Sequence, residues 1–259
     1  LGQYCCCICN SCNPNCCSIF VFSKTNNGWS YCWINKRMSK KALFIAGGWG
    51  GHEPIETSKF IIQEIKKFDI DSELVESLDV MSDLKYLKKY DVILPVWTMG
   101  NIDDDNWEIK DSKIGNLQEA ISSGVGLAGW HGGMTDAFRD NTNYQFLVGS
   151  QFVCHPGNFV DYEVTIIDKD HQSVDGIDNF SVHSEQYFLH IDPSINIIAS
   201  TKFNKKYHDW IDGVEMPIAY SKKWGNGKVF HCSIGHYLKD FENLNVVKLI
   251  TQGINWAAK

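Results

Sequence analysis

The chain has 259 residues, of which 44% are hydrophobic and 21% are charged, and its formal net charge is −7 at pH 7. This composition is that of a globular protein, and the length fits one large α/β domain better than two small ones. The acidic balance without a basic stripe argues against nucleic acid and anionic membranes as partners, and no apolar run is long enough for a membrane-spanning helix.

The first 37 residues differ from the rest of the sequence. Eight of the 10 cysteines lie there, and the segment contains no acidic residue. It lacks the basic start and the small-residue cleavage site of a signal peptide. Because Met38 resembles a natural start, we expect residues 1–37 to be a disordered leader or translated upstream sequence, and residues 38–259 to form a single domain.

Cysteine spacing leaves an alternative for the leader. Cys9, Cys12 and Cys16 have spacings that could bind zinc, but no second pair of ligands completes a structural site. Beyond residue 37 only Cys154 and Cys232 remain, far apart in the sequence. This sparse cysteine usage favours a cytoplasmic protein.

Short apolar runs alternate with helical patterns from residue 42 to residue 130. Three of the four runs end in glycine or tryptophan, which is typical of buried parallel strands, whereas the helical patterns repeat every three to four residues. This alternation predicts an α/β fold with a mostly parallel sheet and helices on both faces. We expect strands at 42–48, 72–76, 91–97 and 124–130, and helices at 54–67 and 112–122.

The C-terminal half of the sequence lacks the strand–helix alternation of residues 42–130 and contains several β-like runs in succession. Gly225-Asn226-Gly227 is a tight turn that predicts a hairpin between two of these runs. We therefore expect added β-strands and a hairpin in this half, closed by an amphipathic helix. The expected strands are 162–167, 180–189, 195–200, 216–224 and 228–233, and the expected helices are 144–149 and 246–258.

The stretch GLAGWHGGMTDAF, residues 126–138, carries the strongest signal of a site. His131 follows a buried strand and precedes Gly132 and Gly133, which is the spacing of a nucleophile elbow, where small neighbours let the backbone turn sharply. Such an elbow normally presents Ser or Cys. Imidazole is instead suited to carrying protons or binding a metal. The alternative is a histidine that only caps the next helix.

Three motifs then follow in order: GWHGGMTDAFRDNTNYQFLVGSQFVCHPG, SEQYF and GKVFHCSIGH. Together they resemble the trehalose-utilisation (ThuA-like) family over about residues 40–258. The resemblance implies the fold of class I glutamine amidotransferases, which is a flavodoxin-like, doubly wound sheet. Those enzymes carry a catalytic cysteine where this sequence has His131. Cysteine-dependent glutamine hydrolysis would require Cys154 or Cys232 to lie beside a histidine, and we do not expect it.

The resemblance also implies a role in carbohydrate metabolism, since the family is associated with trehalose and related disaccharides and with dehydrogenases that make 3-keto sugars. We expect an enzyme that isomerises, eliminates from or hydrolyses a disaccharide or 3-keto sugar, with a sugar dehydrogenase as pathway partner and a homo-oligomeric state. The alternative is a non-catalytic sugar-binding or assembly protein that keeps the fold without the chemistry.

We expect His131, Glu185 and His236 to converge as catalytic residues. Glu185 interrupts an apolar run, so a buried carboxylate there needs a partner such as a histidine, with Arg139 or backbone donors as the alternative. His236 follows a strand beside Gly235, which suggests close approach to a ligand. We expect burial to move the pKa values of Glu185 and His131 toward neutral for acid–base work.

A second set of residues is expected to bind substrate. The tryptophans among them could form a platform for a sugar ring, although core packing is the alternative. The set is Trp49, His52, Trp97, Trp130, Gly132, Gly133, Asp136, Arg139 and His155.

Metal binding is an alternative role for part of the site. Imidazole and carboxylate suit Zn²⁺ or another divalent metal, but no paired-histidine motif marks such a site, so no cofactor is firmly expected. The candidate ligands are His131, His155, Glu185 and His236. The remaining histidines that we consider, His171, His190, His208 and His231, are expected to be structural, on the surface or in the core.

Overall fold

The computed structural model describes residues 16–25, 28–37, 39–102 and 112–259. The chain divides into two compact units, residues 1–39 and residues 40–259. In the first unit, strand β1 (Cys16–Thr25) pairs antiparallel with strand β2 (Gly28–Arg37). That residues 1–37 are a disordered leader or translated upstream sequence stays a prediction. The zinc alternative at Cys9 and Cys12 lies outside the described residues, and Cys16 is described only in its backbone.

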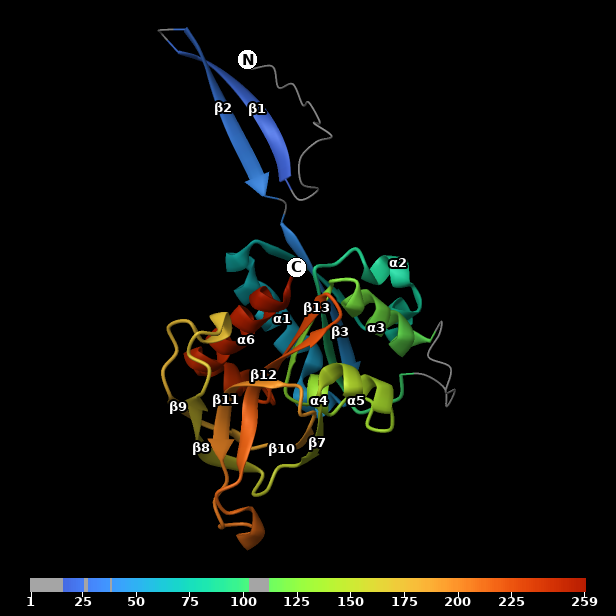
Figure 1. Ribbon diagram of the computed structural model, residues 1–259, viewed down its shortest axis with the longest axis vertical. Helices are drawn as coiled ribbons and strands as arrows, with labels where there is room; N and C mark the ends of the chain where they lie inside the picture. The colour runs from blue at the N-terminus through green and yellow to red at the C-terminus, as the bar shows by residue number, and fades with distance from the viewer. Residues whose placement is uncertain (1–15, 26–27, 38, 103–111) are drawn as a thin grey trace. The chain divides into compact units, whose positions relative to one another are not determined.

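Residues 40–259 contain one nine-stranded sheet, in the order β4-β3-β5-β6-β13-β12-β11-β8-β9 (Figure 1). From β4 to β13 neighbouring strands are parallel, and from β13 to β9 they are antiparallel. The strands are β3 (Lys40–Gly48), β4 (Ile70–Val75), β5 (Val92–Thr98), β6 (Gly126–Trp130), β8 (Phe159–Ile166), β9 (Phe180–Glu185), β11 (Asn196–Lys202), β12 (Glu215–Trp224) and β13 (Gly227–Cys232).

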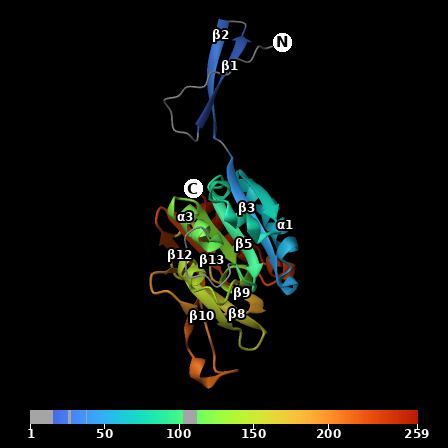
Figure 2. The same cartoon turned by 90° about the vertical axis from the view of Figure 1, so that its right-hand side faces the viewer.

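Helices cover both faces of this sheet, which confirms the predicted α/β architecture. Alternate side chains of β3 face opposite ways. Ala42 and Phe44 pack in the core beneath α1 (Pro54–Ile65) and α6 (Leu244–Ala257). Leu43 and Ile45 pack on the other face, in the core that contains α3 (Lys113–Ser122) and α5 (Thr142–Val148). Figure 2 shows the sheet between α1 and α3.

Short elements join these layers. The helices α2 (Leu84–Leu87) and α4 (Gly132–Thr135) are single turns, and the strands β7 (Ser150–Cys154) and β10 (Phe188–Ile191) pair in a separate sheet. The 3₁₀ helices are Gly50–His52, Lys66–Phe68, Leu78–Ser82, Gln172–Val174, Asp209–Ile211 and Leu238–Glu242.

One predicted strand, 180–189, is in fact two strands in different sheets. β9 ends at Glu185, and β10 starts at Phe188. The break occurs at Gln186, whose buried amide donates a hydrogen bond to Thr201 Oγ1 at 2.8 Å. The buried Gln186 side chain is thus satisfied by β11 at the point where the chain passes from one sheet to the other. Sequence periodicity also placed the start of β8 at residue 162 instead of Phe159 and did not predict β7.

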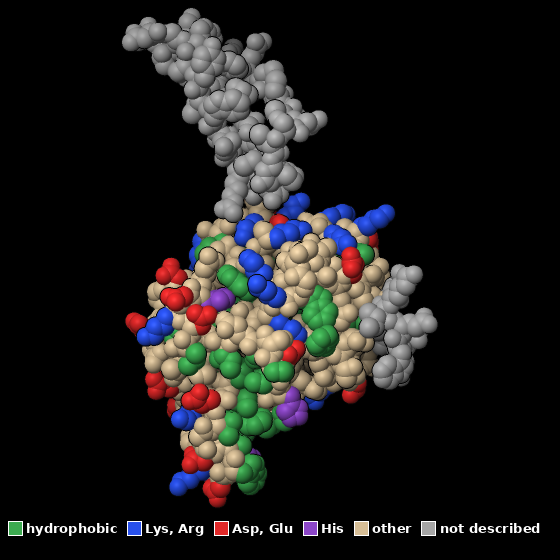
Figure 3. All heavy atoms as spheres, in the orientation of Figure 1, with side chains coloured by type: hydrophobic (Ala, Val, Ile, Leu, Met, Phe, Trp, Pro, Cys, Tyr) green, Lys and Arg blue, Asp and Glu red, His purple; other side chains and the backbone are tan. Residues whose placement is uncertain are grey.

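The surface of residues 40–259 mixes charge types. In the view of Figure 3, basic side chains gather along the upper edge, acidic side chains lie mainly at the left and below, and apolar side chains run from the centre downward. The large exposed apolar side chains include Trp210, Leu244 and Phe146. Among the described residues, no helix is both long and apolar enough to cross a membrane.

Candidate active site

The candidate site lies where the parallel strands end. β3 leads to the 3₁₀ turn that carries His52, β5 ends at Thr98, β6 leads to His131, and β13 leads to the loop that carries His236. The carboxyl ends of parallel strands meet at one edge of a sheet, and ligands in α/β folds bind there. The strand order reverses between β3 and β5, so the site lies beside the topological switch point.

His131 occupies an unusual backbone conformation, with φ of 49° and ψ of −145°. A residue with a side chain rarely adopts such angles, and those that do concentrate at functional sites. The next residue must be small, because a Cβ on Gly132 would lie 2.5 Å from His52 Cε1 and 3.1 Å from the Tyr187 hydroxyl. The GWHGG turn therefore brings three functional side chains together.

The tautomer of His131 follows from its surroundings. Nδ1 lies 2.8 Å from the Ser233 carbonyl oxygen, which can only accept, so Nδ1 carries a proton and donates it. Nε2 points into the site, 2.7 Å from the Tyr187 hydroxyl and 3.2 Å from Nδ1 of His236. The ring is 1% exposed. His131 thus presents a single nitrogen, Nε2, to the centre of the site.

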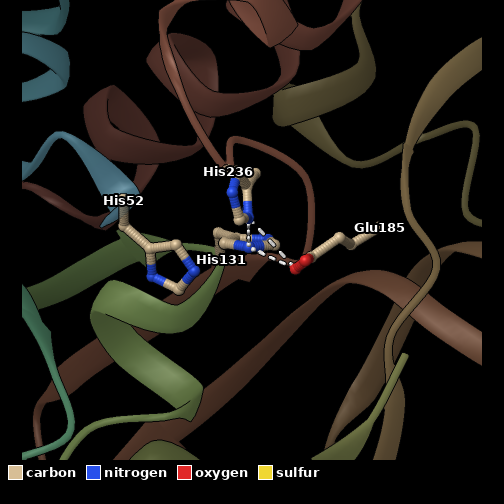
Figure 4. A group of neighbouring side chains, drawn as sticks. All are labelled: His52, His131, Glu185 and His236. Carbon is tan, nitrogen blue, oxygen red and sulfur yellow. Dashed lines mark hydrogen bonds and ion pairs between the residues drawn. The ribbon is translucent and has the colours of Figure 1, made fainter. Parts of the chain in front are cut away.

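Glu185, at the end of β9, supplies the carboxylate (Figure 4). Its Oε2 lies 3.2 Å from His131 Nε2 and 3.1 Å from His236 Nδ1, and its Oε1 lies 3.5 Å from His155 Nε2. Burial raises the pKa of Glu185, but the hydrogen bonds and charges of His131 and His236 outweigh it and hold this pKa well below its usual range. The prediction that burial moves the pKa of Glu185 toward neutral is therefore wrong.

His52 forms the wall opposite Glu185. Its Nδ1 lies 2.7 Å from Thr98 Oγ1, and its ring stands edge-on to the rings of His131 and His236, with centroids 4.7 Å and 4.6 Å away. Burial, together with the neighbouring imidazoles, lowers the pKa of His52 to about 2. His52 is accordingly a neutral imidazole over the physiological pH range.

Two residues that sequence reasoning missed support this cluster. The Tyr187 hydroxyl bonds His131, and the SEQYF motif, in which Tyr187 lies two residues after Glu185, is the signal that could have found it. Asp240 Oδ2 accepts hydrogen bonds from Ser184 Oγ at 2.6 Å and from the backbone N–H of His236 at 2.9 Å. Asp240 therefore ties the strand that ends in Glu185 to the loop that carries His236.

The arrangement offers two kinds of chemistry. One ligand atom from each of His52, His131, Glu185 and His236 lies within 4.8 Å of the others, a spacing that a metal ion could bridge. The same imidazoles and carboxylate can also transfer protons. His155, which was predicted to bind substrate or metal, contacts the outer carboxylate oxygen, and its side chain is 32% exposed. Exposure thus increases outward from the buried centre.

The predicted substrate-binding tryptophans lie in different environments. Trp49 is 47% exposed and its ring contacts that of His52 edge-on, at the rim of the site. Trp97 is half-buried and packs against the core that contains α3. Trp130 is buried and contacts Phe44 and Phe241, so the core-packing alternative holds for this residue.

Other predicted residues have structural partners. Arg139 donates two hydrogen bonds to the buried Asp136 carboxylate, at 2.5 Å and 2.9 Å, and does not pair with Glu185. A Cβ on Gly133 would lie 3.0 Å from Val96 Cα, so this glycine lets α4 pack against β5. His231 is fully buried within β13. His171 accepts a hydrogen bond from the Ser173 N–H, while His190 and His208 are exposed.

Neither cysteine of the second unit serves this site. Cys232 is buried in β13, and burial raises its pKa to about 12. Cys154 is exposed, and partial desolvation raises its pKa as well. Within the described part of the chain, neither sulfur forms a hydrogen bond with a histidine. Both thiols are therefore poor candidates for a thiolate nucleophile.

Comparison with known proteins gives a family and a fold. The family model for trehalose utilisation, ThuA, matches residues 41–257. A ThuA-like protein from Bacteroides uniformis is similar in structure, with a TM-score of 0.64, 15% identity, and coverage of 86% of this chain and 94% of that one. The Salmonella typhimurium protein STM3548, described as cytoplasmic, has a TM-score of 0.54 and 11% identity over 95% of this chain and 97% of its own. No curated protein sequence matches the chain.

Proposed function

The chain belongs to the trehalose utilisation family, ThuA, and from this premise we propose that it is an enzyme of carbohydrate catabolism that acts on a disaccharide or a 3-keto sugar. The observation that carries the proposal is the Glu185 carboxylate, which is buried and shared by His131 and His236 from two other elements. Burying a carboxylate beside histidines costs free energy, and clusters of this kind concentrate at functional sites such as acid–base centres.

The proposed chemistry is general acid–base catalysis. In a 3-keto sugar, the hydrogen on the carbon beside the carbonyl is acidic. A base of the His131–Glu185–His236 cluster removes it as a proton, and the C–H electron pair forms an enediolate. Protonation at the neighbouring carbon then completes an isomerisation. If instead the enediolate electrons expel the glycosidic oxygen, the second cluster group protonates that oxygen and the step is an elimination. Hydrolysis of the glycosidic bond by an activated water is the other route.

The surroundings of the cluster support a sugar as substrate. Trp49 offers an exposed aromatic face at the rim, and the exposed side of His155 offers a polar partner for a sugar hydroxyl. The strand order of the parallel half, second-first-third-fourth-fifth along the chain, favours the flavodoxin-like assignment. A cytoplasmic location, a sugar dehydrogenase as pathway partner and a homo-oligomeric state belong to the same proposal.

Turnover of trehalose and 3-ketotrehalose by the purified chain tests the proposal. We expect product from at least one sugar, and at least a 100-fold lower kcat/KM in His131→Ala, with no change in the exposed-histidine control His190→Ala. If neither sugar turns over but either binds equally well to the wild type and to His131→Ala, the chain is a sugar-binding protein and the enzymatic proposal fails.

A further inference from the structure

The inner nitrogen and oxygen atoms of the site point toward one common centre. Because Nδ1 of His131 donates to Ser233, Nε2 is the ring atom that faces the Glu185 carboxylate, 3.2 Å away. His52 repeats the pattern, since Thr98 occupies its Nδ1 and leaves Nε2 for the cluster. Figure 4 shows these side chains converging from separate elements. Nitrogen and oxygen atoms that converge on a buried carboxylate in this way are held together by protons or by a cation between them.

The distances match a metal site. Three atoms, His131 Nε2, His236 Nδ1 and Glu185 Oε2, form a triangle with sides of 3.1 Å to 3.2 Å. Ligands with bonds of about 2.1 Å lie about 3.0 Å apart in an octahedral site and about 3.4 Å apart in a tetrahedral one. The observed sides fall between these values, so a cation can bind all three atoms without rearrangement of the backbone.

The outer contacts also fit a metal centre. A histidine that binds a metal usually donates its other ring N–H to a carbonyl or a carboxylate, which fixes its tautomer. His131 does so to the Ser233 carbonyl. Asp240 holds the backbone of His236 in the same way that an outer-shell carboxylate positions a ligand. Among the described residues, no lysine or arginine forms an ion pair with Glu185, so its charge is met by imidazoles alone.

We propose that His131, His236 and Glu185 bind one divalent transition-metal ion, with His52 facing the fourth, open side of the site. Imidazole ligands select ions such as Zn²⁺, Co²⁺ or Fe²⁺ over Mg²⁺ and Ca²⁺, which prefer all-oxygen sites. The His52 nitrogen lies within 4.8 Å of the other ligand atoms, which leaves room for a water or a substrate oxygen. Catalytic metal sites keep such an open position.

The inference deepens the proposed function, and its catalytic consequence rests on that function. A keto sugar offers a carbonyl oxygen and a neighbouring hydroxyl oxygen, and the open side can take either. A cation that polarises the carbonyl makes the adjacent C–H more acidic. With the three ligands on the ion, the acid–base role proposed above for their cluster passes to His155 and Tyr187. Binding of the metal itself is independent of whether any sugar reacts.

Cobalt spectroscopy of the full chain tests the inference, because the cysteine-rich leader could also bind metal. Chelator-treated protein is titrated with Co²⁺ under reducing conditions. Nitrogen and oxygen ligands give visible d–d bands, whereas thiolates add charge-transfer bands in the near ultraviolet. We expect one Co²⁺ per chain with d–d bands of nitrogen and oxygen ligation, displaced by one equivalent of Zn²⁺.

Variants assign that signal to the site. Glu185→Gln is nearly isosteric. Loss of a residue that only orients a metal ligand weakens metal binding by about 10- to 100-fold, and we expect loss of the ligand Glu185 to weaken Co²⁺ binding by more than this. His236→Ala should do the same, whereas His190→Ala should not, and circular dichroism checks that each variant is folded. A folded wild type without these bands, or bands that persist unchanged in Glu185→Gln and His236→Ala, overturns the proposal. The Co²⁺ titrations of the wild type and of the variants can be interpreted whether or not a sugar is turned over.

Discussion

The parallel and antiparallel halves of the nine-stranded sheet make different contributions. The parallel half, from β4 to β13, provides His52 and His131 on tight turns at its strand ends. The antiparallel half and the segments beside it provide Glu185 and Tyr187. Neither half holds a complete site. The parallel α/β half therefore acquires its particular chemistry from the strands added to one side of it.

The largest expected effect comes from removing the carboxylate that the antiparallel half supplies. Glu185→Gln keeps the size of the side chain but loses its charge, so His131 and His236 lose the carboxylate that they share. We expect kcat/KM to fall by about 100- to 10,000-fold, as for loss of an acid–base group. Steady-state kinetics with the active sugar measure this effect.

The matched control for that variant is Glu163→Gln, which changes an exposed carboxylate on β8, the strand next to β9. We expect its kinetics to equal those of the wild type. If Glu185→Gln were as active as the wild type, the carboxylate from the antiparallel half would have no part in the chemistry.

Asp240→Ala should remove the tie between β9, in the antiparallel half, and the loop after β13 that carries His236. The change removes an acceptor that serves Ser184, the His236 N–H and the Gly235 N–H, all of them buried. Each unpaired donor costs on the order of 1 kcal/mol, so we expect the free energy of unfolding to fall by about 3 kcal/mol. Urea titration measures it, with the exposed Asp178→Ala as a control expected to change little. A loss of less than about 1 kcal/mol would mean that this tie contributes little to the stability of the fold.

Gly132→Ala tests the close approach on the parallel side. The added Cβ would lie 2.5 Å from His52 Cε1, so His52 must move away from His131. We expect a loss of stability of about 2 kcal/mol, typical of overpacking, together with reduced turnover. Gly50→Ala is the control, because a Cβ there meets no atom within 4 Å. Thermal unfolding that is indistinguishable between the two variants would contradict the expected crowding.

The smallest effect concerns an ion pair far from the site, between Asp192 and Lys222 of β12. The Lys222 ammonium, at 2.7 Å, and the Ser194 N–H lower the pKa of Asp192 from 3.8 to about 2. The lowered value means that the pair stabilises the fold above pH 4, and that this contribution disappears as the pH falls from 4 to 2. Allowing for solvent screening, we expect about 1 kcal/mol.

Asp192→Asn isolates that contribution. Its free energy of unfolding should lie about 1 kcal/mol below that of the wild type at pH 5, and the difference should vanish near pH 2. A constant difference over this range would show that Asp192 acts through hydrogen bonds alone. The charge of this pair would then contribute nothing to the stability of the antiparallel half.

The sequence predicted the parallel half better than the antiparallel half, and the reason is physical. Strands buried on both faces are continuous apolar runs, such as 42–48 and 91–97, which periodicity detects directly. Half-exposed strands carry weaker patterns. The 180–189 run hid a change of sheet because a buried glutamine is paired by β11, a contact that no local pattern encodes.

The candidate site was predicted in outline because its glycines mark sharp turns. The GWHGG and IGH motifs identified His131 and His236, and the polar interruption identified Glu185. Asp240 and Tyr187 were not predicted, since their roles depend on hydrogen bonds to residues far away in the sequence, Ser184 and His131. The lowered pKa of Glu185 could not be predicted either, because it depends on how many imidazoles surround the carboxylate.

The place of β13 in the sheet has a consequence for how the protein is made. β13 lies between β6 and β12, yet it is the last strand along the chain. Until residue 232 has left the ribosome, β6 and β12 each present an open edge, and the two halves of the sheet cannot join. Open edges invite pairing with other chains. A chain that stops short of β13 therefore loses its site and also gains two surfaces prone to aggregation.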